Sequence, residues 1–153
     1  MLLTPHTIIA LYLILNFNPA LALPASFVSH FLFDFFFPHW NPHLFTEMKE
    51  NGKLSWNTLK VIFGDALLAL GLTLFFAFKK LPNYQEAFFI LIAAFLAILP
   101  DIIEIPYYFL KSKNGILKKI INFEHLHQAK ANKFWGSFSQ IVLIIICLWA
   151  ILK

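Results

Sequence analysis

The chain has 153 residues, of which 59% are hydrophobic, 13% are charged and 19 are phenylalanine. This composition excludes an ordinary water-soluble domain, because the longest apolar stretches reach the length of about 20 residues that a bilayer requires. The net charge of +4 comes from lysine alone, and lysine lacks the planar fork that reads nucleic acid bidentately. We therefore expect membrane lipids as partners and no nucleic acid.

The first two apolar segments meet at a strong turn signal, the Asn-Phe-Asn-Pro sequence of residues 16–19. Residues 7–17 are short for a membrane span. At about 1.5 Å per residue they cross roughly half of a bilayer core, which leaves open a half-helix or a helix that extends past these ends. The second segment covers residues 19–37 and stops before Pro38.

Three longer apolar segments follow, and each has the length of a membrane span: residues 55–78, 84–110 and 134–152. Ser55 suits the N-cap of the first of them. Pro100 and Pro106 lie inside the second, which we expect them to kink.

Two polar connections separate these segments, residues 39–54 and 111–133. The second contains six lysines, and residues 116–123 alternate apolar side chains with Lys118 and Lys119, which predicts a short helix at the membrane surface. The predicted fold is all-α, an integral membrane bundle of four to five transmembrane helices with a short interfacial helix. We expect one helical domain over residues 1–153.

Lysine counts predict the orientation. If all five segments cross the membrane, the N-terminus and both long connections share one side, with eight lysines against three on the other. The positive-inside rule then places the long loops in the cytoplasm of a multi-pass cell-membrane protein. A first segment that does not cross would move only His6 to the other side.

Ionisable side chains inside the predicted spans cost roughly 2.5–3.5 kcal/mol each on insertion scales, so each needs a partner. On the predicted helices His30 and Asp34 share one face, as do Asp101 and Glu104, and Asp65 lies on a third helix. All five fall in the predicted cytoplasmic half. A single intramembrane aspartate is often a hydrogen-bonded packing residue, and for Asp65 we weigh this alternative equally.

The remaining histidines lie near the same predicted mouth of the bundle. They are His39, His43, His125, His127 and, if the N-terminus is cytoplasmic, His6. Imidazole and carboxylate are the ligand types that zinc and other borderline divalent metals take, and a shared cation would offset the carboxylate charge. The single cysteine, Cys147, excludes a thiolate cluster.

The run Ser29-His30-Phe31-Leu32-Phe33-Asp34, followed by Pro38-His39, carries a family resemblance. It is similar to the metal-binding helix of the zinc-dependent phospholipase C and single-strand nuclease group. It also resembles the Ser-His-x3-Asp segment of the predicted membrane-bound metal-dependent hydrolases, and Leu99-Pro100-Asp101 resembles the Leu-Pro-Asp element of that family. The resemblance implies a divalent metal, zinc by ligand type, held by His30, Asp34, Asp101 and His39, with His6 and His125 as further ligands.

These observations favour a membrane metal-dependent hydrolase that acts on an ester or phosphoester, such as a lipid headgroup, near the cytoplasmic surface. Glu104 or Asp65 would then serve as general base or orient the ligands. Two alternatives stay open. The intramembrane carboxylates would form a cation or proton path in a small transporter, which Pro100 beside Asp101 favours, or the polar cluster would be structural.

Overall fold

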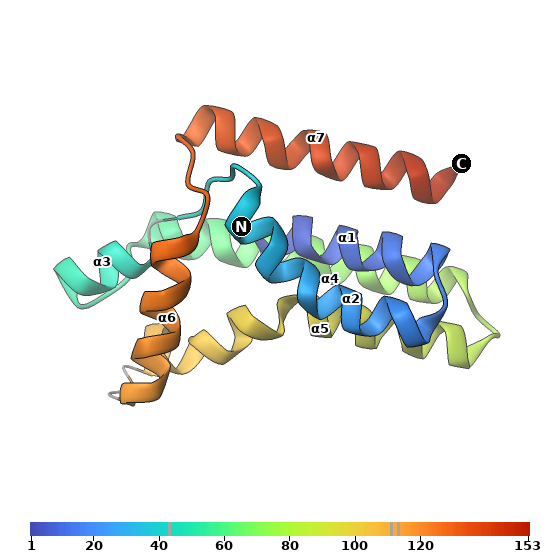
Figure 1. Cartoon of the computed structure of the whole chain (residues 1–153), viewed down its shortest axis with the longest axis horizontal. Coiled ribbons are helices and arrows are strands. Elements are labelled where there is room, and N and C mark those ends of the chain that lie inside the picture. The colour runs from blue at the N-terminus through green and yellow to red at the C-terminus, as the bar shows by residue number, and fades with distance from the viewer. Residues whose placement is uncertain (43, 111, 113) are drawn as a thin grey trace.

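The computed structural model describes residues 1–42, 44–110, 112 and 114–153. Over these residues the protein is an all-α membrane bundle, as predicted (Figure 1). Four of its helices are long and apolar enough to cross a membrane: α2 (Pro19–Phe36), α4 (Trp56–Lys79), α5 (Tyr84–Leu110) and α7 (Lys133–Leu152). Three shorter helices complete the described part of the chain: α1 (Leu3–Asn16), α3 (Leu44–Asn51) and α6 (Gly115–His127).

The shortest apolar helix, α1, lies at the centre of the bundle. It packs against α2, α4, α5 and α7 (Figure 1). Ile8, Ala10 and Leu11 have no exposed surface, and nine of its 14 residues are buried. A helix that is apolar on every side is expected to be enclosed in this way. Its 14 residues rise only about 21 Å, and its first residue, Leu3, bonds Asp65 in the interior of α4, so its N-terminal end lies below the start of α4.

Side-chain caps fix where the helices begin. The side chain of Asn18 accepts a hydrogen bond from Ala20 N at the start of α2, and Ser55 accepts one from Thr58 N at the start of α4. Asn114 and Asn132 cap α6 and α7 in the same manner. The predicted N-cap role of Ser55 is confirmed.

The connection 39–54, expected to be a polar loop, contains the helix α3. Glu47 on α3 accepts hydrogen bonds from Ser55 N at 2.8 Å and from Thr58 Oγ1 at 2.7 Å, so this helix is tied to the start of α4. Helix α6 covers the predicted interfacial helix and extends to His127. Its outward face carries Ile116 and Phe123, which are 72% and 54% exposed, as a helix in the interface requires.

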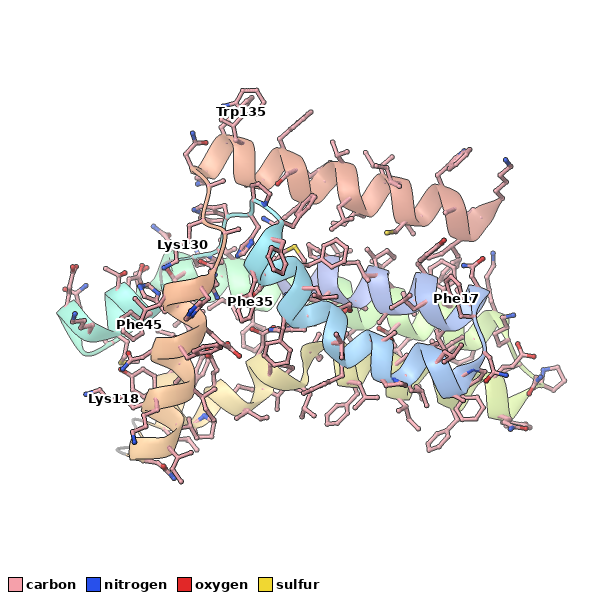
Figure 2. The ribbon with its side chains drawn as sticks, in the orientation of Figure 1. Phe17, Phe35, Phe45, Lys118, Lys130 and Trp135 are labelled. Atoms are coloured by element: carbon pink, nitrogen blue, oxygen red, sulfur yellow. The ribbon has the colours of Figure 1, made fainter. Side chains whose placement is uncertain are left out.

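The outer surface of the bundle is apolar. Large hydrophobic side chains on the long helices are more than half exposed, among them Leu67, Phe78, Phe138 and Trp149. Trp135 lies at one end of α7 (Figure 2), and Trp149 lies near the other. Exposed apolar bands flanked by aromatic residues are typical of a lipid-facing surface.

Both long connections and the N-terminus lie at the same end of the bundle (Figure 1). His39 forms an isolated parallel bridge with Lys130: His39 N donates to Ala129 O at 3.0 Å, and Ala131 N donates to His39 O at 2.8 Å. Ala129 N also donates to the backbone oxygen of Asp34. These bonds hold the segment after α6 against the end of α2, where the polar residues lie.

Gly136 allows α7 to approach this same segment. A Cβ atom at Gly136 would lie 2.7 Å from His39 C and 2.7 Å from Trp40 Cβ, both of which belong to the chain that follows α2. Gln140, one turn further along α7, donates to Trp40 O at 2.8 Å and accepts from Leu2 N at 3.0 Å. Helix α7 is therefore anchored to the polar end of the bundle by a close backbone contact.

The substitution Gly136→Ala is expected to destabilise the protein by about 1–3 kcal/mol, because the new methyl group must displace backbone atoms. The melting temperature in detergent measures the effect. Gly71 on α4 is the matched control, since a Cβ there meets no atom within 4 Å. Equal melting temperatures for Gly136→Ala and Gly71→Ala would contradict the close approach of α7.

Candidate metal centre

Three helices bring buried histidines and aspartates together at the polar end of the bundle. His6 is the fourth residue of α1, His30 and Asp34 lie one turn apart on α2, and Asp101 lies on α5. His39 follows α2 directly. His6, His30, Asp34 and His39 are each at most 3% exposed, and Asp101 is half-buried. Such groups are costly at this depth unless they hold one another or a cation.

Asp65 positions α1, and hence His6. Its carboxylate accepts hydrogen bonds from Leu3 N at 2.5 Å and Thr4 N at 3.2 Å, and its backbone oxygen accepts one from Thr4 Oγ1 at 3.1 Å. A carboxylate at a helix N-terminus satisfies free N–H groups and complements the positive end of the helix. Asp65 is the tenth residue of α4, about 14 Å along that helix, which places the start of α1 below the helix ends.

The imidazoles of His6 and His30 form a stacked pair, with ring centroids 4.0 Å apart and an interplanar angle of 18°. The ring of His30 lies between two carboxylates: Nε2 is 3.9 Å from Asp34 Oδ2, and Nδ1 is 3.9 Å from Asp101 Oδ2. His6 Nε2 lies 3.2 Å from Asp34 Oδ1. One ligand atom from each of His6, His30 and Asp101 lies within 4.8 Å of the other two.

Backbone carbonyls select the tautomers of two of these rings. His30 Nδ1 lies 2.8 Å from Ala97 O, and His39 Nδ1 lies 2.8 Å from Phe37 O. A carbonyl oxygen only accepts, so each Nδ1 carries the proton and each Nε2 presents a lone pair. Metal-binding histidines are oriented by this type of bond.

The Nε2 lone pairs of His30 and His39 accept no hydrogen bond from the described residues. Among the described residues, His30 Nε2 and His39 Nε2 are buried without a hydrogen-bond partner, as are His6 Nδ1 and Asp101 Oδ2. Buried polar atoms are rarely left in this state, and several of them in one place point to a group that they bind together.

Asp34 connects His39 to the stacked pair. His39 Nε2 lies 3.9 Å from Asp34 Oδ1, and the amino group of Met1 lies 2.6 Å from the same oxygen. Burial is the main cause that lowers the pKa of the His39 imidazole to about 4, so this ring is neutral at physiological pH. A neutral imidazole beside a carboxylate is the form in which histidine coordinates a metal.

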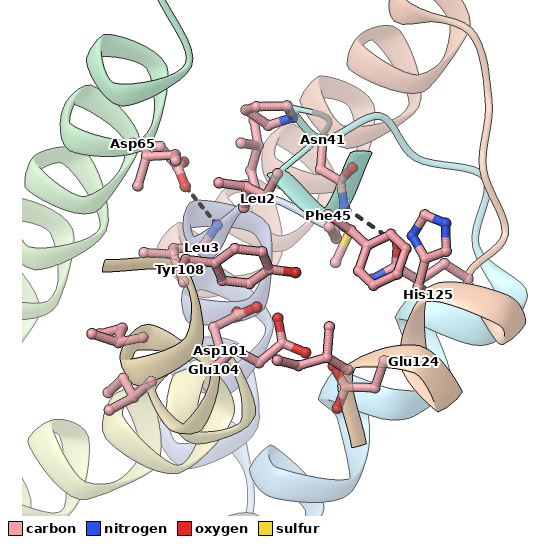
Figure 3. A pocket seen from close by; sticks show the side chains of 18 of the residues that line it. Leu2, Leu3, Asn41, Phe45, Asp65, Asp101, Glu104, Tyr108, Glu124 and His125 are labelled. Carbon is pink, nitrogen blue, oxygen red and sulfur yellow. Dashed lines mark hydrogen bonds between the residues drawn. The ribbon is translucent and has the colours of Figure 1, made fainter. Parts of the chain in front are cut away.

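A pocket of about 280 Å³ opens next to this centre (Figure 3). Asp101, Glu104 and Tyr108 line it from α5, and Glu124 and His125 line it from α6. Asp101 therefore belongs both to the histidine cluster and to the pocket wall. Glu104 lies one turn further along α5, on the same face.

The remaining histidines lie outside the cluster. The ring of His125 stacks on Phe45 at a centroid distance of 4.2 Å and lies 3.0 Å from Lys130 Nζ, at the pocket rim. His127 is exposed, and its Nδ1 bonds Phe123 O. His43 lies outside the described residues. Of the predicted ligands, the structure thus brings together His6, His30, Asp34, His39 and Asp101, and it places His125 on the neighbouring pocket.

Two polar residues that matter here escaped the sequence analysis. Glu124 is 6% exposed and interacts with Glu104 across the α5–α6 contact, and Gln140 is 2% exposed. Glu124 falls three residues after the buried Ile121, on the inner face of α6. A carboxylate on the apolar face of an amphipathic helix was the signal that could have revealed it.

No protein-family model, no curated protein and no solved structure matches this chain.

Proposed function

We propose that this protein is a membrane metal-dependent hydrolase that acts on an ester or phosphoester near the membrane surface. The observation that carries the proposal is the buried stacked pair His6–His30 between Asp34 and Asp101, with ring nitrogens that have no hydrogen-bond partner among the described residues. One ligand atom from each of the proposed ligands His6, His30 and Asp101 lies within 4.8 Å of the other two. Tetrahedral zinc ligands at about 2.0–2.2 Å from the metal lie roughly 3.3–3.6 Å from one another.

The donor types fit a divalent metal, and zinc suits two or more imidazoles with carboxylates. His6, His30 and Asp101 would hold the ion. Asp34 orients His6 and faces both His30 and His39, in the manner of the carboxylates that support metal-bound histidines. When bound, such an ion lowers the pKa of a coordinated water molecule toward neutrality and so supplies a nucleophile.

Glu104 is the residue to which we assign the general-base role. It lines the pocket one turn from Asp101, and its carboxylate faces the cavity in which a substrate would lie (Figure 3). The other candidate from the sequence, Asp65, accepts two backbone N–H groups of α1 and is therefore engaged in holding that helix. Both long connections lie at the site end and carry most of the lysines, so we place this end in the cytoplasm, at the cell membrane.

Metal analysis of the protein purified in mild detergent without chelator tests the proposal. We expect about one divalent ion per chain, as in mononuclear hydrolases, and loss of most of it in His30→Ala and Asp101→Asn. His127→Ala is the matched control and should retain the metal, because that ring is exposed on α6. Wild-type protein without stoichiometric metal would overturn the proposal, and cation flux that depends on Asp101 in proteoliposomes would then favour transport.

A further inference from the structure

The pocket beside the metal centre reaches the outer surface of the bundle between two membrane-spanning helices. Its wall includes Phe63 on α4 and Ile105 and Phe109 on α5. These three side chains are 68%, 44% and 46% exposed, so they line the pocket and the outside of the bundle at once. Because α4 and α5 have the length and composition of membrane spans, we expect this opening to face the hydrocarbon of the bilayer.

The opposite side of the pocket is polar. Asn41, Gln128 and Lys130 line it where the two long connections meet. Lys130 Nζ donates to the backbone oxygen of His125 at 2.8 Å, which holds the ammonium at this rim. Lys118 and Lys119 are exposed on the adjoining helix α6. Lysines at a membrane surface attract anionic lipid headgroups.

The pocket therefore runs from an apolar opening, past the carboxylates of Asp101 and Glu104, to a basic rim. We infer that a phospholipid enters this pocket from the bilayer through the opening between α4 and α5, with an acyl chain along Phe63 and Ile105 and the phosphate at Lys130. This inference rests on the proposed function and identifies its substrate class as a membrane phospholipid. The volume of about 280 Å³ is near the lower end for ligand pockets, about 300 Å³, which suits a segment of the lipid around its ester groups.

A polar solute would use this architecture poorly. The apolar residues of the wall give a soluble phosphoester no partner. They are Ile62, Phe63 and Ala66 on α4 and Ile102, Ile105 and Phe109 on α5. An amphiphile buries its acyl chain against these residues without leaving the bilayer in which it is already dissolved. The chain then aligns the headgroup with Asp101 and Glu104, which is the positioning that a remote binding contact supplies to a reaction.

Two pairs of substitutions test the opening. Ile105→Trp narrows it, and Ile103→Trp is the control, because Ile103 is equally exposed at 42% on the same helix and does not line the pocket. Ala66→Trp and Leu67→Trp form the corresponding pair on α4. If one variant of a pair fails to fold, the other pair gives the answer.

Proteoliposomes of phosphatidylglycerol and phosphatidylcholine supply the probe, and phospholipid retained by the purified protein is counted by native mass spectrometry. We expect retained phosphatidylglycerol to fall about tenfold in Ile105→Trp and Ala66→Trp, equivalent to about 1.4 kcal/mol, and to stay unchanged in both controls. Hydrolysis of vesicle lipid should fall in parallel. Equal lipid retention in all four variants, or unchanged hydrolysis of vesicle lipid in Ile105→Trp and Ala66→Trp, would overturn the inference.

Metal content measured on the same samples separates the two proposals. The four variants are expected to keep the metal of the wild type, since Ala66 and Ile105 are not among the proposed ligands. If phospholipid binds and is lost in Ile105→Trp, but the protein contains no metal, the lipid-binding inference stands and the hydrolase proposal is rejected. If the protein contains metal but retains no phospholipid, the metal centre stands and the lipid-binding inference is rejected.

Discussion

Asp65→Ala is expected to destabilise the protein by about 1–3 kcal/mol, because it leaves the backbone N–H groups of Leu3 and Thr4 without their acceptor in a partly buried site. These groups begin the central helix α1, on which four other helices pack. The loss should therefore appear as a lower melting temperature of the whole bundle. Thermal unfolding in detergent, followed by circular dichroism, measures it.

Asp65→Asn is the graded control for this experiment. Its side-chain oxygen can still accept one hydrogen bond from the start of α1, so its melting temperature should lie between those of the wild type and Asp65→Ala. Since the same contact sets the position of His6, Asp65→Ala should also weaken metal binding by about tenfold or more, the usual effect of a residue that supports a ligand. Unchanged stability and metal affinity in Asp65→Ala would contradict the capping role.

The long helices could be predicted because their signal is local. Residues 55–78, 84–110 and 134–152 each hold enough consecutive apolar side chains for a span, and the structure places α4, α5 and α7 there within two residues. The faces shared by His30 with Asp34 and by Asp101 with Glu104 follow in the same way from the helical period alone. Such features need no knowledge of which helices are neighbours.

The central position of α1 could not be predicted, because it depends on contacts between distant residues. The bond from Leu3 N to Asp65 joins residues 62 apart, and that from Leu2 N to Gln140 joins residues 138 apart. From the sequence alone, a short apolar helix fits a half-span at the edge of a bundle as well as it fits a central helix. Only its enclosure by the longer helices shows that it carries His6 into the interior.

The same limit applies to the candidate site. From the sequence, Asp65 was grouped with the other intramembrane carboxylates, because the residue type alone does not distinguish a carboxylate that binds a metal from one that caps a helix. The structure separates these roles through the atoms that surround each group: two backbone N–H donors at Asp65, and unpartnered imidazole nitrogens near Asp34 and Asp101. Hydrogen-bond donors are supplied by tertiary packing, which a linear pattern of residue types does not contain.

Glu104→Gln is expected to reduce hydrolysis by about 10²–10⁴-fold, because the amide keeps the shape of the side chain and cannot accept the proton of an attacking water molecule. The metal content should match that of the wild type, since Glu104 is not one of the proposed ligands. Single-turnover hydrolysis of phosphatidylglycerol vesicles measures the effect, with the metal counted on the same sample. A structural role for Glu104 would lower stability instead and leave the rate per folded molecule unchanged.

Glu86→Gln is the matched control for this substitution. Glu86 lies on the same helix, at the opposite end of α5, where it pairs with Lys80 at 3.0 Å outside the pocket. Exposed pairs of this kind contribute little to stability, so the variant should hydrolyse lipid at the wild-type rate. Full activity in Glu104→Gln would reject Glu104 as the general base. Lost metal in Glu104→Gln would instead make this carboxylate a ligand, so the metal count and the rate together distinguish a base beside the metal from a ligand of it.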